Sequence, residues 1–444
     1  MFAAPPGENG RYRLVTVQAK MGVLATRLAY VGVLAAALLA PFHFAFPPAG
    51  LATNVANAFA FRYSVATAVD AIQNVLLFAG WGALWATTTR PTPLPQALRG
   101  PALTGAAMSL VAEVLQLFLP DRRASVLDVM TNTAGAVLGA AAIVIAVQTA
   151  RAARMQKSYV GLPAIGFAIA YLGAAIAEAA LPLQTAAVID AGGTARLHRM
   201  RSAAAQLDWT SLWRIPLADV ILFFPLGVFG VMALVERGAP HWAACRRVCA
   251  WGLFGAVLIE AAHGPLGQPI QLGSAVAHFL GLALGAIASA LWLPGFSRVV
   301  RGRGRPMTVL LAYAMLIAFW AWRPFVLETD PTTIHEQFSL ERLLPLHGLA
   351  RRSDFASVAE IVKPFFLFFP LGAMLAVWPL KRRGWLSACL PAFYLAAITE
   401  VVQGFVAGRF FDGTDLVIQC AAAAIGWSVA RQAGYEPYGA VLGD

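Results

Sequence analysis

Four polar side chains recur, in the same order and at the same spacing, in two distant parts of a strongly apolar chain. The members of the first set are Glu113, Gln116, Arg122 and Asp128. The members of the second set are Glu400, Gln403, Arg409 and Asp415. A pattern that returns at a fixed interval indicates an internal repeat. Polar groups that occur twice in apolar surroundings also indicate a shared function.

Carboxylates and a guanidinium at this spacing allow two kinds of chemistry. A carboxylate can act as a general base while the guanidinium stabilises developing negative charge. The candidate catalytic residues are Glu113, Asp128, Glu400 and Asp415. A guanidinium can instead hold a phosphate through two parallel hydrogen bonds. A third interpretation involves no ligand, because the same charges can form a buried ion network that fixes the turn between two helices.

A ligand-binding role draws on a wider set of polar residues. Asn132 lies one turn beyond Asp128, and Asn74 is expected near the same end of a neighbouring helix. The candidate ligand-binding residues are Asn74, Glu113, Gln116, Arg122, Asp128, Asn132, Glu400, Gln403, Arg409 and Asp415. We expect them near the extracytoplasmic ends of their helices, with Glu113 only about 10 Å deep at ~1.5 Å per residue.

The composition places these residues in a membrane. Of the 444 residues, 59% are hydrophobic and only 12% are charged, and the mean hydropathy is +0.67. Soluble globular proteins do not have this composition. Apolar runs long enough to cross a ~30 Å hydrocarbon core recur along the whole chain. We expect an all-α, polytopic integral membrane protein with about twelve transmembrane helices, at residues 28–47, 65–88, 98–119, 126–149, 158–183, 213–235, 242–263, 272–293, 306–326, 357–380, 384–405 and 413–432.

The distribution of Lys and Arg predicts the orientation of these helices. Loops rich in these residues face the cytoplasm. They cluster before the first predicted helix and after the second, fourth, sixth, eighth and tenth. We therefore expect a multi-pass protein with both termini in the cytoplasm. The net charge of +11 then reflects topology, and no nucleic-acid partner is expected.

The predicted helices divide into three repeats of four helices each. Repeat 1 covers residues 28–150, repeat 2 covers 158–297 and repeat 3 covers 306–432. Residues 1–27 and 433–444 are expected to be cytoplasmic tails. Because each repeat has an even number of helices, all three have the same orientation, unlike the inverted repeats of many transporters.

The last helix of each repeat carries polar and small residues on one face. Their spacing of i, i+4, i+7 and i+11 aligns them along a helix. Small residues separated by three others allow two helix backbones to approach closely. The residues expected to serve helix packing are Gly135, Gly139, Gly281, Gly285 and Gly426.

With these motifs the chain resembles the VanZ-like family of bacterial membrane proteins. The similarity rests on a Phe-x-Pro-Leu-Gly phrase, on Glu-x2-Gln followed by the Arg and Asp of the next loop, and on Asn-x2-Gly-x3-Gly. Repeat 1 matches best, and repeat 3 carries Gln419 and Ala422 in place of Asn and Gly. Repeat 2 is degenerate, because Glu260 and Gly281 remain but no Arg occupies the loop position.

The resemblance implies a cell-envelope protein of the bacterial cytoplasmic (inner) membrane. It also implies a link to glycopeptide-type antibiotic resistance, such as resistance to teicoplanin, or to envelope polysaccharide biogenesis. The resemblance thus implies where the protein is located, and it does not specify a biochemical reaction.

Three functions remain open at this point. The first is binding of an anionic envelope-lipid headgroup, such as a polyprenyl phosphate or its sugar-linked form, through Arg122 and Arg409. The second is an intramembrane acid/base enzyme that acts on such a lipid, although Ser125 is the one nucleophile in sight and becomes Asp412 in repeat 3. The third is a transporter, which the expected position of the polar residues near one surface disfavours.

The remaining expectations concern cofactors and partners. We expect no metal and no cofactor, because the four cysteines show no metal-binding spacing with histidine. The expected partner is a membrane lipid. The oligomeric state is left open.

Overall fold

Helices make up the secondary structure that the computed structural model describes, apart from isolated β-bridge residues such as the pair Leu327 and Val406. The described residues are 8–39, 42–47, 50–60, 65–89, 93–120, 122–153, 158, 162–180, 215–263, 270–299, 305–339, 342, 355–377 and 385–435. The chain forms two compact units. The N-terminal unit comprises residues 1–62 and 71–145, and the C-terminal unit comprises residues 63–70 and 146–444.

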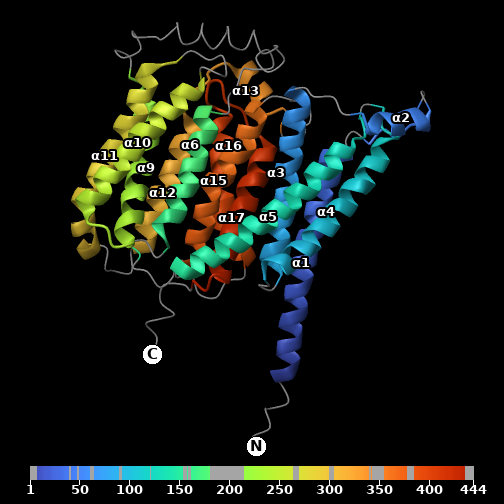
Figure 1. Cartoon of the computed structure of the whole chain (residues 1–444), viewed down its shortest axis with the longest axis horizontal. Coiled ribbons are helices and arrows are strands. Elements are labelled where there is room, and N and C mark those ends of the chain that lie inside the picture. The colour runs from blue at the N-terminus through green and yellow to red at the C-terminus, as the bar shows by residue number, and fades with distance from the viewer. Residues whose placement is uncertain are drawn as a thin grey trace, which may run out of the picture. The chain divides into compact units, whose positions relative to one another are not determined.

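The N-terminal unit is built on the helices of repeat 1 (Figure 1). They are α1 (Glu8–Leu39), α2 (Leu51–Ala58), α3 (Val65–Thr88), α4 (Leu94–Gln116) and α5 (Val126–Ala153). The first residues of α3 and the last of α5 are counted with the C-terminal unit. Leu34 of α1, Phe78 and Trp81 of α3 and Ala136 of α5 form a buried cluster. Apolar segments of this kind form helices in lipid because a helix satisfies its own backbone hydrogen bonds.

The C-terminal unit contains repeats 2 and 3 in one helical bundle (Figure 1). Its helices are α6 (Ala164–Ala180), α9 (Leu217–Glu236), α10 (His241–His263), α11 (Leu272–Val299), α12 (Arg305–Trp322), α13 (Pro331–Gln337), α15 (Phe355–Val377), α16 (Trp385–Gln403) and α17 (Gly413–Gln432). Helix α6 packs against both α9 and α15. Its Tyr171 shares a core with Leu222 of α9 and Phe368 of α15. Repeats 2 and 3 therefore share one hydrophobic core.

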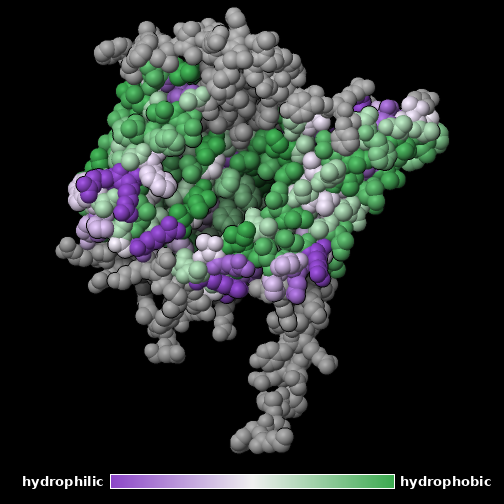
Figure 2. Space-filling model, in the orientation of Figure 1, coloured by the Kyte–Doolittle hydropathy of each residue, from purple (hydrophilic) through white to green (hydrophobic). Residues whose placement is uncertain are grey.

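The outer surfaces of both units suit a lipid environment. Large apolar side chains are exposed, among them Trp251 (81%), Met315 (73%) and Leu103 (72%). Figure 2 shows mainly hydrophobic residues along the sides of the helices and hydrophilic residues near the helix ends. In a soluble protein such a surface would aggregate. The protein is therefore a membrane protein with apolar sides.

Six of the described helices are long and apolar enough to cross a membrane. They span Val126–Ala153, Leu217–Glu236, His241–Ala261, Leu272–Gly295, Val358–Val377 and Gly413–Gln432. Four shorter apolar helices span Leu24–Leu39, Ala164–Glu178, Thr308–Trp322 and Leu390–Gln403. Each span expected from the sequence overlaps a helix of the structure. The all-helical fold is confirmed, while twelve crossings in three parallel repeats stay a prediction.

In each repeat, glycines of the fourth helix lie directly against the backbone of the second helix. A Cβ atom at any of these glycines would collide with a carbonyl oxygen of the facing helix. The contacts are Gly135 with Val75, Gly139 with Ala79, Gly281 with Val220, Gly285 with Phe224 and Gly426 with Phe369. The stripe of small residues therefore brings the second and fourth helices of one repeat together.

In each repeat, a tyrosine of the opening helix forms a hydrogen bond to the backbone of the second helix. The hydroxyl donates to a leucine carbonyl oxygen, and the phenylalanine that follows this leucine is buried. The bonds are Tyr30 to Leu77 at 2.6 Å, Tyr171 to Leu222 at 2.7 Å and Tyr313 to Leu367 at 3.0 Å. A buried tyrosine hydroxyl needs such a partner. Repeat 2 therefore has the same internal bond as the other two, although it lacks the loop arginine.

The turn after the opening helix also has the same geometry in repeats 1 and 3. Phe42 and Phe325 both adopt a left-handed backbone conformation, with φ of 65° and 63°. The chain then bonds to the end of the third helix, through the Ala45 amide to the Phe118 carbonyl at 2.8 Å in repeat 1. The Glu328 amide makes the corresponding bond to the Phe405 carbonyl at 3.0 Å in repeat 3.

Several details differ from the sequence-based expectations or lie outside the described residues. Helix α1 begins at Glu8, within the segment expected to be a tail, and ends at Leu39. The short helix α13 lies in the outer segment expected at 327–356, whereas the segment at 184–212 falls outside the described residues. Many of the loop cations used for the orientation, such as Lys381 and Arg382, also fall outside them.

Candidate functional site

A glutamate near the end of the third helix binds the backbone of the loop that follows. Glu113 Oε2 accepts a hydrogen bond from the Ser125 amide at 2.6 Å. Glu400 Oε2 accepts one from the Asp412 amide at 3.3 Å. The first glutamate is 6% exposed and the second is fully buried. The recurring carboxylate therefore holds the connection between the third and fourth helices of its repeat.

Repeat 2 has the same bond, although it lacks the loop arginine. Glu260 Oε2 accepts from the Gln271 amide at 3.1 Å, and its side chain is 3% exposed. On the fourth helix, His278 stacks on Phe223 with ring centroids 4.1 Å apart. Its Nε2 lies 3.8 Å from a carboxylate oxygen of Asp219. The polar face of repeat 2 thus consists of an imidazole and carboxylates.

In repeat 1 the buried amide of α5 pairs with a serine. Asn132 is fully buried, and its Nδ2 donates to Ser109 Oγ at 2.8 Å. Glu113 Oε1 and Asn132 Oδ1 are buried and have no hydrogen-bond partner among the described residues. A buried acceptor without a donor costs about 1–3 kcal/mol. Repeat 1 therefore keeps unused acceptor capacity at the end of its helices.

In repeat 3 the corresponding amide pairs with the glutamate. Gln419 stands where repeat 1 has Asn132, and Ala396 stands where it has Ser109. Gln419 Nε2 donates to Glu400 Oε1 at 2.6 Å. Gln419 Oε1 is then the outward acceptor, and it has no partner among the described residues.

The recurring arginines bind the backbone of the opening helix or of its end. Arg122 Nη2 donates to the Ala37 carbonyl at 3.2 Å, and Arg409 Nε donates to the Arg323 carbonyl at 3.0 Å. In repeat 1, Gln116 Nε2 makes a further bond to this helix at 3.1 Å. Each of these contacts ties the loop of the repeat to its first helix.

An ion cluster beside Arg409 involves a residue that the sequence motifs did not indicate. Glu178 of α6 binds Arg323 through Oε1 and Lys363 through Oε2, both at 2.8 Å. All three side chains are largely buried. Glu178 belongs to repeat 2, whereas both cations belong to repeat 3. The signal in the sequence is a single acidic residue within an apolar helix, which is costly in lipid and so marks a functional position.

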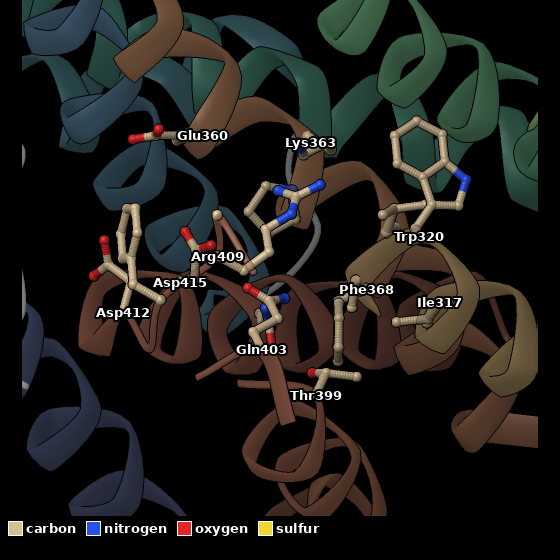
Figure 3. Close-up of a pocket in the computed structure, with 16 residues that line it drawn as sticks. Ile317, Trp320, Glu360, Lys363, Phe368, Thr399, Gln403, Arg409, Asp412 and Asp415 are labelled. Carbon is tan, nitrogen blue, oxygen red and sulfur yellow. The ribbon is translucent and has the colours of Figure 1, made fainter. Parts of the chain in front are cut away.

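The ion cluster adjoins a cavity of about 200 Å³ in the C-terminal unit. Its polar lining includes Glu360, Lys363, Arg409, Asp412, Asp415 and Gln419. Ile317, Trp320 and Phe368 supply an apolar wall. In Figure 3 the three carboxylates lie toward the left of the view, and Lys363 and Arg409 lie beside one another near its centre. The cavity lining therefore contains groups of both charges.

The structure brings part of the expected site together in repeat 3. Gln403, Arg409 and Asp415 line the cavity, and Glu400 reaches it through Gln419. In repeat 1, Asn74 on α3 and Asp128 on α5 are half-buried, at helix positions comparable to their expected ones. Among the described residues, no group of three His, Cys, Asp or Glu side chains could hold a metal ion.

Comparison with known families identifies repeats 1 and 3. The VanZ/LLP1 family profile matches residues 18–147 and 307–434, which together make up more than half of the chain. The chain therefore belongs to the VanZ/LLP1 family and contains two VanZ-like units. Residues of repeat 2 lie outside both matches, so a third, degenerate unit stays a prediction. A search of curated proteins and a search of solved structures found no significant match.

Proposed function

We propose that this VanZ/LLP1 protein binds the phosphate-bearing headgroup of a cell-envelope lipid in the cavity of repeat 3. The observation that carries the proposal is the presence of two cations, Lys363 and Arg409, in one cavity of a protein with lipid-compatible sides. A guanidinium and an ammonium are the side chains that bind phosphate oxygens best.

The position of Arg409 supports this role. Its Nε donates a hydrogen bond to the Arg323 carbonyl oxygen, and this bond orients the planar guanidinium at the cavity. Lys363 is held by Glu178, so its ammonium is fixed before a ligand arrives. Fixed groups lose less entropy on binding than mobile ones. The two cations thus form a prearranged phosphate site.

The location of the cavity suits a lipid with its chains outside the protein. The cavity lies where α16 ends and α17 begins, so a headgroup there would be close to one membrane surface. We place this surface on the extracytoplasmic side of the bacterial inner membrane, with both termini in the cytoplasm. A polyprenyl phosphate is one lipid of this kind. A role in glycopeptide resistance or in envelope polysaccharide biogenesis would follow from such binding.

Repeat 1 offers a second, weaker phosphate site. Arg122 occupies the loop position of Arg409, but Gln73 stands at the position of Lys363. The site of repeat 1 therefore has one cation, where the site of repeat 3 has two. We therefore assign the main binding role to repeat 3 and a lesser one to repeat 1.

Native mass spectrometry of the detergent-purified protein tests the proposal. The parent should retain a phosphate-bearing envelope lipid, and the Arg122→Ala/Arg409→Ala double variant should lose it. Arg237→Ala is the matched control, because Arg237 is an exposed arginine at the end of α9. Equal lipid content in the parent and the double variant would refute a headgroup site and favour a purely structural role for the charges.

A second candidate function is an acid/base enzyme that acts on the same lipid. Asp412 and Asp415 line the cavity together with Arg409, so a general base and an electrostatic stabiliser are available in one place. This candidate predicts turnover of an envelope lipid that Asp415→Asn abolishes while the fold is intact. Unchanged turnover in that variant would exclude Asp415 as the base.

A further inference from the structure

We infer that the headgroup in the repeat 3 cavity carries a primary amine as well as a phosphate. This inference rests on the proposed function, since it assigns the phosphate to Lys363 and Arg409. It adds that the opposite side of the cavity binds an ammonium group. The ligand class is therefore a zwitterionic, amine-bearing phosphate ester.

The charges that line the cavity carry the first part of the argument. Three carboxylates, those of Glu360, Asp412 and Asp415, share the lining with Lys363 and Arg409. Figure 3 shows the carboxylates toward one side of the view, and Lys363 and Arg409 beside one another near its centre. A headgroup with only negative charge would meet the carboxylates as well as the cations, and like charges at close range repel. A headgroup with charges of both signs matches both sides.

The amide of Gln419 carries the second part. Gln419 is 4% exposed and lines the cavity. Its Nε2 is committed to Glu400, and its Oε1 has no donor among the described residues. Buried acceptors are nearly always hydrogen-bonded in folded proteins. A ligand N–H group would supply the missing donor, and a phosphate oxygen could not.

The size of the cavity sets a limit on the headgroup. About 200 Å³ is less than the volume of typical small-molecule sites, which hold roughly 300–1,000 Å³. It suits a short chain of atoms between a phosphate and an amine. The acyl or prenyl chains would remain along the apolar helix surface.

Repeat 1 shows the same excess of acceptors on a smaller scale. Glu113 Oε1 and Asn132 Oδ1 are buried and lack donors among the described residues. They lie where repeat 3 has Glu400 and Gln419. Repeats 1 and 3 therefore both contain buried acceptors without a donor on their third or fourth helix, and repeat 3 also contains two buried donors without an acceptor among the described residues, Trp322 Nε1 and Arg323 Nε.

Lipid selection from mixed nanodiscs tests the inference on the full-length protein. The probes are three lipids with identical acyl chains: phosphatidylethanolamine, its N-acetylated form and phosphatidylglycerol. Native mass spectrometry should show at least about tenfold enrichment of phosphatidylethanolamine over the other two. A tenfold preference corresponds to ~1.4 kcal/mol. The enrichment should fall severalfold in Asp415→Asn and in Gln419→Met, which is similar in size to the parent side chain.

Controls separate a fold defect from a loss of recognition. Asp330→Asn makes the same chemical change on the exposed surface and should keep the full preference. Both cavity variants should keep the helical content of the parent by circular dichroism. Soluble phosphoethanolamine is added in a separate arm, and displacement of the lipid by it at similar concentration would identify a free metabolite as the source of the chemistry.

The outcomes distinguish this inference from the proposed function. Retention of phosphatidylglycerol that depends on Arg409, with no preference for the amine, would overturn the inference and leave the proposed function standing. Equal binding of the N-acetylated lipid would overturn it in the same way. Lipid content that does not depend on Arg409 would overturn both.

Discussion

Repeats 1 and 3 share one skeleton but differ in what their polar side chains contact. In both, the glutamate of the third helix binds a loop amide, through Glu113 in one and Glu400 in the other. The amide on the fourth helix binds a serine in repeat 1, whereas Gln419 binds Glu400 in repeat 3. The glutamate–loop bond also occurs at Glu260 of repeat 2, which has no loop arginine.

This difference separates structural residues from functional ones. A bond present in all three repeats, including one without the loop arginine, serves the fold. Some groups that line the cavity differ between the repeats, such as Lys363 and Asp412, where repeat 1 has Gln73 and Ser125, whereas Arg409 recurs as Arg122. We therefore expect ligand chemistry to depend on Arg409 together with the positions that differ, and we assign the recurring glutamate a structural role.

The largest effect is expected from removing the glutamate in repeat 3. Glu400→Ala leaves the Asp412 amide and Gln419 Nε2 without an acceptor, which should cost about 2–5 kcal/mol of unfolding free energy. Glu113→Ala leaves only the Ser125 amide and should cost about 1–3 kcal/mol. Thermal unfolding in detergent, followed by circular dichroism, compares the two. Equal losses of unfolding free energy in the two variants would contradict the expectation that Glu400 accepts more hydrogen bonds than Glu113.

The next effect concerns the ion cluster that repeat 1 lacks. Glu178→Gln leaves Arg323 and Lys363 without their carboxylate and should cost about 1–3 kcal/mol, since the groups are partly exposed and the penalty is smaller than for full burial. Adding Lys363→Gln, which copies Gln73 of repeat 1, should recover part of this loss.

A double-mutant cycle on unfolding free energies measures that recovery. Strictly additive costs for Glu178→Gln and Lys363→Gln would show that the two side chains do not stabilise one another. The same variants should weaken lipid retention, because Glu178 positions Lys363 at the cavity.

Helix packing gives a third comparison between the repeats. Gly135→Ala places a methyl group against the Val75 carbonyl and should destabilise the N-terminal unit by about 1–3 kcal/mol. Repeat 3 already has Ala422 at this position, and Ala422→Gly should cost only about 0.5–1 kcal/mol, the usual difference in helix propensity. Urea titrations of both variants measure the unfolding free energies. An unchanged unfolding free energy in Gly135→Ala would refute the close contact with the Val75 carbonyl.

The smallest expected effect concerns the N-terminal caps of the two short helices, α2 and α13. Hydrogen bonds from the hydroxyls of Thr332 and Thr333 and from the Thr333 amide lower the pKa of Asp330 from 3.8 to about 2. A lowered pKa stabilises the cap of α13 above pH 3.8, and this stabilisation is lost as the pH falls toward 2. The N-cap residue of α2 is Gly50, which makes no side-chain hydrogen bond to the helix.

Hydrogen exchange between pH 2 and pH 5 should therefore show a pH-dependent loss of protection in α13 that α2 does not share. Asp330→Asn should remove this dependence. A parallel loss in both helices would indicate a general acid effect in place of a cap.

The sequence predicted the helices and the recurrence, but only part of the site. Hydrophobic runs and the recurring motifs predicted the helices and three VanZ-like units, of which the units at residues 18–147 and 307–434 are confirmed. The partner of a buried carboxylate was not predictable, because Glu113 with Arg122 and Asp128 is equally compatible with an ion network and with the observed bond to a backbone amide. Glu178 was missed because its partners lie in another repeat, and only the packing of α6 on α15 brings them together.

The central claim is that repeat 3, and not repeat 1, provides the main lipid site. The direct test is quantitative native mass spectrometry of the two single variants, Arg409→Ala and Arg122→Ala, beside the parent. We predict that Arg409→Ala loses most of the bound phosphate-containing lipid and that Arg122→Ala retains most of it. Equal retention in both variants, or a greater loss in Arg122→Ala, would contradict the account.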